Sequence, residues 1–324
     1  MINTVYRLVA PRRFEIAFED INLFGENAIV RPTYLSICNA DMRYYLGTRD
    51  AKVLAEKLPM ALIHEGVGEV FLDPTGTFKT GDKVVMVPNA PVEKDEFIAE
   101  NYLRSSKFCG SSMDGFLQEF VEISPKRLVK LPDYIDMTVA AFTEIVSVSV
   151  HAISRFDKIA HARRNTISVW GDGNLGYITS LFLKYNFPKS KIVVFGTSSD
   201  KLADFTFADE THLVNEVPDG FTTDHAFECV GGNGSPIAIE QIIGLIKPEG
   251  TISILGVSEY PVPINTRMIL EKGLRVFGSS RSGVKDFAKT VDMYKKHPEI
   301  IDYLGNLINL SLIHISEPTR HAQI

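Results

Sequence analysis

The pattern of apolar and polar positions divides the chain into a β-rich first part and a second part in which strands and helices alternate. Up to about residue 146, short β-forming runs are separated by Gly, Pro and Asp turns. These runs are Ala28–Leu35, Val67–Leu72, Lys83–Val87 and Leu117–Ile123. Several short strands at irregular spacing predict a small barrel-like or sandwich domain.

From about residue 147 to 276 the spacing of apolar residues alternates between that of strands and that of helices. The candidate parallel strands are Ile192–Phe195, Ala226–Val230, Thr251–Leu255 and Arg275–Phe277. Beyond residue 277 the chain is helical again, with Phe287, Val291 and Tyr294 spaced for one buried face. The pattern predicts an α/β protein of two domains, one of them a doubly wound parallel sheet, and a chain of 324 residues is long enough for both.

A strand, a glycine turn and a helix follow one another directly after Asn165. Thr166–Trp170 is rich in β-formers, and the turn Gly171-Asp172-Gly173-Asn174-Leu175-Gly176 comes next. Helical spacing then relates Leu175, Ile178, Leu181, Phe182 and Tyr185. This is the context that a dinucleotide fingerprint requires, whereas the six-residue motif alone could be an ordinary glycine-rich loop.

Each glycine of the turn has an expected role. Gly171 permits a sharp turn, Gly173 leaves room for a pyrophosphate, and Gly176 allows the helix to approach the strand. Free backbone N–H groups at the start of the helix favour phosphate binding. We therefore expect a nicotinamide cofactor to bind at Gly171, Gly173, Asn174, Leu175 and Gly176.

The sequence after the second strand of this βαβ unit favours NADPH over NADH. An acidic residue about 20 positions beyond the glycines would bind the ribose hydroxyls of NAD, but Phe195-Gly196 stands there. Small hydroxyl residues with a nearby cation suit a 2′-phosphate, although Asp200 opposes it. The residues expected at the 2′ end are Thr197, Ser198, Ser199 and Lys201.

Charge and cysteine content narrow the functional classes. The net charge of −6 argues mildly against nucleic acid or an anionic membrane as a partner. No apolar run has the length of a membrane span, and the first residues lack the layout of a signal peptide. Three cysteines, Cys38, Cys109 and Cys229, make a disulfide framework improbable and fit a reducing cytoplasm.

Three residues of the β-rich part offer the ligand types of a catalytic zinc site. Cys38 follows an apolar run, and His64 and Glu65 precede Gly66-Val67-Gly68-Glu69. Thiolate, imidazole and carboxylate together form such a ligand set. A single cysteine is more often a small core residue, and a single histidine is more often structural, so the prediction depends on their conjunction beside a dinucleotide fold.

The order of these motifs resembles that of the zinc-dependent medium-chain dehydrogenases from residue 1 to about 306. The motifs are Cys38-Asn39-Ala40-Asp41, His64-Glu65-Gly66-Val67-Gly68-Glu69-Val70, Gly81-Asp82-Lys83-Val84 and the glycine turn. The resemblance implies a GroES-like catalytic domain of residues 1–146 and 277–308 and an NADP-binding Rossmann domain of residues 147–276. Residues 309–324 show neither a clear period nor a cap, so we interpret them as a tail that is foreign to the natural protein, and we assign it no role in the fold.

The resemblance also implies further site residues. Thr143-Glu144-Ile145-Val146-Ser147 resembles a Glu-Pro-Leu-Ser segment of the polyol dehydrogenase branch, whose glutamate lies at the zinc. It implies that Cys38, His64, Glu65 and Glu144 are metal ligands or near-ligands, and that the two glutamates alternate in the inner shell.

The chain departs from the family in two places. The lobe that often holds a second, structural zinc corresponds to residues 89–112 and contains only Cys109, so one zinc is expected. In the usual proton relay of the family, a hydroxyl residue stands at the position of Ala40 and a histidine at the position of Arg43. Since both are replaced here, water on the metal or Glu65 would deliver the proton. Arg43 is either a surface residue or a cation that binds a substrate phosphate.

Within the family the chain resembles the branch of ribulose-5-phosphate reductases that serves ribitol synthesis for teichoic acids and capsules. That branch implies zinc-dependent, NADPH-linked reduction of D-ribulose 5-phosphate to D-ribitol 5-phosphate in the cytoplasm by a homodimer or homotetramer, with a cytidylyltransferase as partner. The alternatives are an NAD-dependent polyol or sorbitol dehydrogenase and a non-catalytic nucleotide-sensing protein. The nucleotide-sensing alternative is disfavoured because the chain retains all four of the residues that the resemblance places at the metal.

Overall fold

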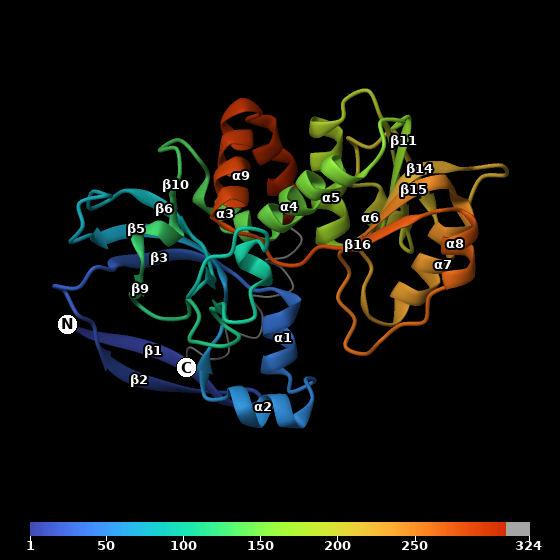
Figure 1. Ribbon diagram of the computed structural model, residues 1–324. Helices are drawn as coiled ribbons and strands as arrows, with labels where there is room; N and C mark the ends of the chain where they lie inside the picture. Colours follow the sequence, from blue (N-terminus) through green and yellow to red (C-terminus); the bar gives the residue numbers. More distant parts are fainter. Residues whose placement is uncertain (309–324) are drawn as a thin grey trace. The chain divides into compact units, whose positions relative to one another are not determined.

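The computed structural model describes residues 1–308 and divides into two compact units (Figure 1). The first unit is Met1–Ser147 with the residues from Arg281 onward, and the second is Val148–Ser280. The tail interpreted as foreign, residues 309–324, lies outside the described part. The expected domain end at residue 276 falls inside β16 (Arg275–Gly278), which is a strand of the second unit.

Antiparallel strands form the sheets of the first unit. They are β1 (Ile2–Ala10), β2 (Arg13–Asp20), β3 (Ala28–Ser36), β4 (Met60–Ala61), β5 (Glu65–Leu72), β6 (Lys83–Met86), β7 (Asn89–Ala90), β8 (Lys107–Phe108), β9 (Val121–Ile123) and β10 (Leu128–Lys130). The sheet orders are β10-β6-β5-β3-β9, β2-β1-β4 and β7-β8. A β-rich first part was predicted, and the structure confirms it.

Helices connect and flank these strands. They are α1 (Asn39–Tyr45), α2 (Ala51–Lys57), η1 (Glu100–Tyr102), η2 (Pro125–Arg127), α3 (Met137–Ala140) and α9 (Val284–Lys296), while α4 (Thr143–Ile159) continues into the second unit. Residues 299–308 are also helical. In α9 the predicted apolar stripe of Phe287, Val291 and Tyr294 is buried, which confirms the helix and its buried face.

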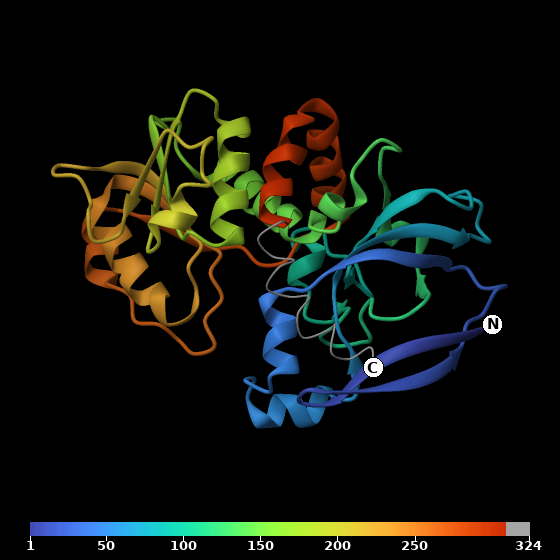
Figure 2. The same ribbon diagram turned by 180° about the vertical axis from the view of Figure 1, so that it is seen from behind.

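Two parts of the β-rich region differ from the prediction. The hairpin of β1 and β2 was not predicted, and its turn is tied to α1 by the Arg12 N–H, which donates to the Tyr45 carbonyl at 2.8 Å (Figure 2). The run Leu117–Ile123 forms a strand only in β9. The residues before β9 bond to β1 instead, since Tyr6 N–H donates to Leu117 O and Glu119 N–H donates to Thr4 O.

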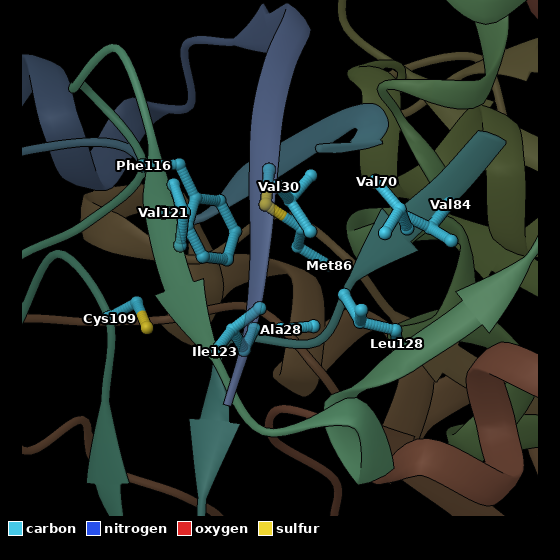
Figure 3. Close-up of a cluster of buried hydrophobic side chains, with 10 residues drawn as sticks. All are labelled: Ala28, Val30, Val70, Val84, Met86, Cys109, Phe116, Val121, Ile123 and Leu128. Atoms are coloured by element: carbon cyan, nitrogen blue, oxygen red, sulfur yellow. The ribbon is translucent and has the colours of Figure 1, made fainter. Parts of the chain in front are cut away.

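Aliphatic side chains from the five-stranded sheet form a core of this unit (Figure 3). It contains Ala28, Val30, Val70, Val84, Met86, Val121, Ile123 and Leu128, with Phe116 and Cys109 from the connecting loops. Burying each large aliphatic side chain contributes roughly 1.5–3 kcal/mol. Burial also raises the pKa of the Cys109 thiol to about 12, so this cysteine is a neutral core residue.

Close packing of β3 on β5 depends on two glycines. A Cβ at Gly66 would lie 2.6 Å from Leu35 Cδ2, and a Cβ at Gly68 would overlap the Arg31 carbonyl. Gly68 has no room for a side chain because it faces main-chain atoms, whereas a side chain at Gly66 would require the ends of neighbouring side chains to move.

We expect Gly68→Ala to destabilise the protein by about 1–3 kcal/mol, because the added methyl group would overlap main-chain atoms that have no room to move. Gly244→Ala is the matched control. It adds the same group in α7 (Ser235–Leu245), where no atom lies within 4 Å, and replacing a helical glycine stabilises by about 0.5–1 kcal/mol. Thermal unfolding midpoints of both variants test this, and equal midpoints would contradict the packing argument.

The second unit is a six-stranded parallel sheet in the order β13-β12-β11-β14-β15-β16. Its strands are β11 (Thr166–Trp170), β12 (Lys191–Gly196), β13 (Glu210–Leu213), β14 (Thr223–Glu228), β15 (Ile246–Ile254) and β16. Its other helices are α5 (Asn174–Asn186), α6 (Ser199–Leu202), η3 (Gly232–Gly234), α7 and α8 (Thr266–Glu271). The predicted doubly wound sheet is confirmed, although β13 was not predicted.

The strand order reverses between β11 and β14. The chain passes from β11 to β12 on one side and returns to β14 on the other, so the loops after β11 and β14 separate at this point. Open parallel sheets bind ligands in the crevice at the carboxyl ends of such strands. The predicted glycine turn follows β11 directly, at this switch point.

Candidate active site

The pairing of β3 with β5 explains why Cys38 and His64 meet. Ser36, the last residue of β3, lies opposite Glu65, the first residue of β5. Because the strands are antiparallel, the chain leaves β3 and enters β5 at the same end of the sheet. Cys38 Sγ consequently lies 3.5 Å from His64 Nε2, although 26 positions separate the two residues.

Glu65 completes a compact group of potential metal ligands with these two residues. One ligand atom from each of Cys38, His64 and Glu65 lies within 4.8 Å of the other two. Among the described residues, these three form the group of His, Cys, Asp or Glu side chains whose ligand atoms are close enough to hold one metal ion. Sulfur, imidazole nitrogen and carboxylate oxygen are the donors that Zn²⁺ binds in catalytic sites.

The electrostatics of the group fit a divalent cation. Burial, together with the Asp41 and Glu65 carboxylates, raises the pKa of the Cys38 thiol. Burial and the neighbouring Glu144 also raise the pKa of Glu65. Acidic groups that are crowded together away from water favour their protonated forms, and a bound Zn²⁺ would reverse this by stabilising the thiolate and carboxylate directly.

Asp41 contacts both Cys38 and His64. The sequence placed this residue in the Cys38 motif but did not predict a role for it. Its Oδ2 accepts hydrogen bonds from Cys38 N and Cys38 Sγ, both at 3.0 Å. Its Oδ1 lies 3.8 Å from His64 Nδ1, the ring nitrogen that faces away from the thiol. At 3.8 Å this is an electrostatic contact and not a hydrogen bond. The sequence feature that could have indicated this role is the position of Asp41 as the third residue of α1, where it forms a capping box with Cys38.

Asp41 also holds the residue before His64 in a strained conformation. Ile63 has φ of +72°, a left-handed value that is rare for a β-branched residue. Its N–H donates to Asp41 Oδ1 at 2.9 Å, and its carbonyl accepts from Phe116 N at 2.7 Å. Strain of this kind persists where the surroundings determine it, and it occurs often at functional sites.

Glu144 lies in the first turn of α4 and is buried. It is outside the group of three mutually close ligand atoms in the described chain, yet it is near enough to interact with its residues. Burial raises the pKa of Glu144, the neighbouring Asp41 raises it further, and His64 and Arg281 oppose the increase. Alternation of Glu65 and Glu144 at the metal stays a prediction.

Ala40 and Arg43 lie on α1, the helix that begins after Cys38. Ala40 has no hydroxyl with which to relay a proton. Arg43 is half-buried and makes an interaction within the protein. Its predicted contact with a substrate phosphate stays a prediction.

The glycine turn of the second unit has the geometry expected of a dinucleotide loop. Gly171 adopts φ of +132°, which favours glycine. A Cβ at Gly176 would overlap the Gly171 carbonyl, whereas one at Gly173 would meet no atom within 4 Å. Gly173 caps α5, so Asn174 and Leu175 present the free N–H groups of its first turn.

The loop after β12 is organised by Asp172, which sequence reasoning did not select. Its Oδ2 accepts from Thr197 N at 2.6 Å, Ser198 N at 2.9 Å and Thr197 Oγ1 at 3.1 Å. Burial opposes ionisation of this carboxyl, but the hydrogen bonds lower its pKa. Ser198 caps α6 by accepting from Lys201 N, and Ser199 and Lys201 belong to that short helix.

Comparison with known proteins identifies the family. Residues 25–133 match the alcohol dehydrogenase GroES-like domain, and residues 189–296 match the zinc-binding dehydrogenase domain. The chain is 56% identical over 308 residues to a ribulose-5-phosphate reductase of Bacillus spizizenii, covering 95% of this chain and 90% of the relative. It belongs to the zinc-binding alcohol dehydrogenase family. The predicted family and the predicted pair of GroES-like and Rossmann folds are thereby confirmed.

Other members of the family agree with this assignment. Ribulose-5-phosphate reductase 1 of Staphylococcus aureus is 56% identical over 307 residues, with 95% of this chain and 90% of the relative covered. The crystal structure of S. aureus TarJ in complex with NADPH superposes with a TM-score of 0.85 at 51% identity, covering 95% of this chain and 89% of that one.

A more distant structure shows only the shared fold. Galactitol-1-phosphate dehydrogenase from Escherichia coli superposes with a TM-score of 0.76 at 18% identity, covering 91% of this chain and 89% of that chain. In the part of the chain that the structure describes, no helix is both long and apolar enough to cross a membrane.

Proposed function

We propose that this chain reduces D-ribulose 5-phosphate to D-ribitol 5-phosphate with NADPH and one zinc ion. The observation that carries the proposal is the convergence of Cys38, His64 and Glu65 within 4.8 Å in a chain 56% identical to a ribulose-5-phosphate reductase. The identity extends over both units, so the cofactor loop and the metal ligands belong to the same comparison.

The metal-site residues have distinct tasks in this reaction. Cys38 Sγ, His64 Nε2 and a carboxylate oxygen of Glu65 would hold the ion, with Glu144 exchanging for Glu65. Asp41 fixes the orientation of Cys38 through two hydrogen bonds and lies near the His64 ring. When bound, zinc supplies Lewis-acid polarisation of the substrate carbonyl, and the nicotinamide supplies the hydride.

A proton must also reach the product hydroxyl. Ala40 cannot relay one through its side chain. Because Glu144 is proposed to exchange for Glu65 at the metal, the Glu65 carboxyl group would be able to hold a proton while it is not a ligand. We therefore assign delivery of the proton to Glu65 or to water on the metal.

Cofactor specificity is assigned to the loop after β12. No carboxylate stands at Phe195-Gly196, and the Asp172 carboxylate accepts hydrogen bonds from the N–H groups of Thr197 and Ser198. Thr197, Ser198, Ser199 and Lys201 are therefore proposed to face the 2′-phosphate of NADPH.

A matched pair of substrates tests the proposal. NADPH oxidation should be faster with D-ribulose 5-phosphate than with D-ribulose, and the product should be D-ribitol 5-phosphate. A higher kcat/KM for reduction of D-ribulose, or for oxidation of sorbitol with NAD, would assign the chain to the polyol dehydrogenases. Cofactor binding without turnover on any ketose would instead favour the nucleotide-sensing alternative.

Arg43→Ala is expected to raise KM for D-ribulose 5-phosphate by about tenfold to a hundredfold, because an arginine–phosphate contact contributes about 1.5–3 kcal/mol. The KM for unphosphorylated D-ribulose should change little. Steady-state kinetics with both substrates check this, and an equal loss for both would remove Arg43 from the phosphate site.

The proposed cellular setting follows from the product. D-ribitol 5-phosphate would pass to a cytidylyltransferase in the cytoplasm for CDP-ribitol and teichoic-acid or capsule synthesis. We propose a homodimer or homotetramer, which light scattering of the purified enzyme would test.

A further inference from the structure

Arg281 is a half-buried cation beside the proposed metal ligands. Its guanidinium carbon lies 4.6 Å from the centre of the Phe108 ring. The same ring contacts the His64 imidazole, with ring centres 5.3 Å apart and planes inclined by 59°. One aromatic side chain therefore separates the guanidinium from a proposed ligand of the metal.

The guanidinium makes no hydrogen bond to any described residue. Arg281 forms no hydrogen bond or salt bridge with any of residues 1–308, and Phe108 supplies its close contact. Stacking on a ring uses the face of the guanidinium and leaves its in-plane N–H donors available. A half-buried arginine with available donors is suited to bind an anion that comes from outside the protein.

The backbone at Arg281 is also strained. Its φ is +58°, in the left-handed region, which is unfavourable for a residue other than glycine. The following residue is fixed to α4, because Ser282 Oγ and Ser147 Oγ are 2.6 Å apart and Ser147 Oγ donates to the Glu144 carbonyl. Such strain persists where neighbouring contacts impose it.

A second set of contacts holds the backbone three residues beyond Arg281. Val284 N–H donates to Glu100 Oε1 at 2.9 Å. Glu100 is in turn held by two hydrogen bonds from Arg127, at 2.8 Å and 2.9 Å. Contacts at Ser282 and Val284 thus hold the backbone that follows Arg281, whose guanidinium lies over Phe108.

We propose that Arg281 binds the phosphate group of the substrate and sets the preference for phosphorylated ketoses. The inference rests on the proposed function, in which the substrate carbonyl lies at the metal. The phosphate of a ketopentose 5-phosphate lies three carbons beyond the carbonyl, and Phe108 provides a comparable separation between His64 and Arg281. The planar donor fork of arginine matches two phosphate oxygens.

The nearness of Glu144 suggests a competing role for Arg281, which is to balance the charge of this carboxylate. Burial lowers the pKa of Arg281, and the nearby Glu144 carboxylate opposes this decrease. Arg281 could thus serve only to balance Glu144, with no contact to substrate. That role predicts equal losses with phosphorylated and unphosphorylated ketoses, so kinetics separate the two.

Arg281→Gly is the variant of choice, because glycine adopts the left-handed φ without strain. We expect KM for D-ribulose 5-phosphate to rise about tenfold to a hundredfold, with little change for D-ribulose or in KM for NADPH. Arg281→Lys keeps the charge without the fork and should give an intermediate KM. Arg12→Gly is the matched control, because Arg12 is an exposed arginine with φ of +63°. It should behave as the wild type.

The outcomes separate the inference from the proposed function. If wild-type enzyme does not prefer D-ribulose 5-phosphate to D-ribulose, the proposed function fails. If it does and Arg281→Gly retains that preference, the role of Arg281 alone is wrong. A selective rise in KM for NADPH would assign Arg281 to a cofactor phosphate and would also overturn the inference.

Discussion

Cys38→Ser is expected to remove zinc and to lower kcat for ketose reduction by about a thousandfold or more, while the fold remains. A Lewis acid supplies several kcal/mol of transition-state stabilisation, and each 1.36 kcal/mol is a factor of ten in rate. Serine keeps the size of the side chain but loses the sulfur that lies 3.5 Å from His64 Nε2. Elemental analysis and steady-state kinetics of the purified variant measure both effects.

Cys109→Ala is the matched control for the metal experiment. Cys109 belongs to the hydrophobic core of the five-stranded sheet, so its replacement should lower stability without removing zinc. Wild-type enzyme and this variant should each contain one zinc per chain. An active wild-type enzyme without zinc would contradict the metal site, and two zinc ions per chain would contradict the predicted absence of a second, structural site.

Ser198→Asp is expected to lower kcat/KM for NADPH by at least about tenfold and to change that for NADH much less. A carboxylate at this position would repel the cofactor 2′-phosphate. Aspartate is also a good helix N-cap, so the hydrogen bond that Ser198 accepts from Lys201 N can be retained. Kinetics with both cofactors, each at saturating ketose, provide the measurement.

Ser198→Asn is the control of similar size without charge, and it should keep the wild-type preference for NADPH. Gly196 is a poorer position for the acidic residue. A Cβ there would lie 2.7 Å from Asp172 Cβ and 2.9 Å from Asp172 Oδ2. Equal or better efficiency of the unmodified enzyme with NADH would overturn the assignment of NADPH.

Much of the fold could be predicted because its signals are local. The strand Thr166–Trp170 was predicted with its observed bounds, since β-formers end there at a glycine turn. The alternation of strands and helices was likewise readable from the period of apolar residues. By contrast, β13 is short and only partly buried, so it carries little pattern.

The site was predictable in its residue types but not in its supporting contacts. Cys38, His64 and Glu65 could be selected because their donor chemistry is specific. Their convergence depends on the register that places Ser36 opposite Glu65, which no local pattern determines. The hydrogen bonds of Asp41 and the left-handed backbone of Arg281 are set by tertiary contacts as well, so only the structure identifies them.

The central claim is tested most directly by following NADPH oxidation with D-ribulose 5-phosphate before chelation, after chelation, and after zinc is restored. The account predicts that activity disappears with the metal, returns with one zinc ion per chain, and produces D-ribitol 5-phosphate. Full activity of fully chelated, zinc-free enzyme would contradict it.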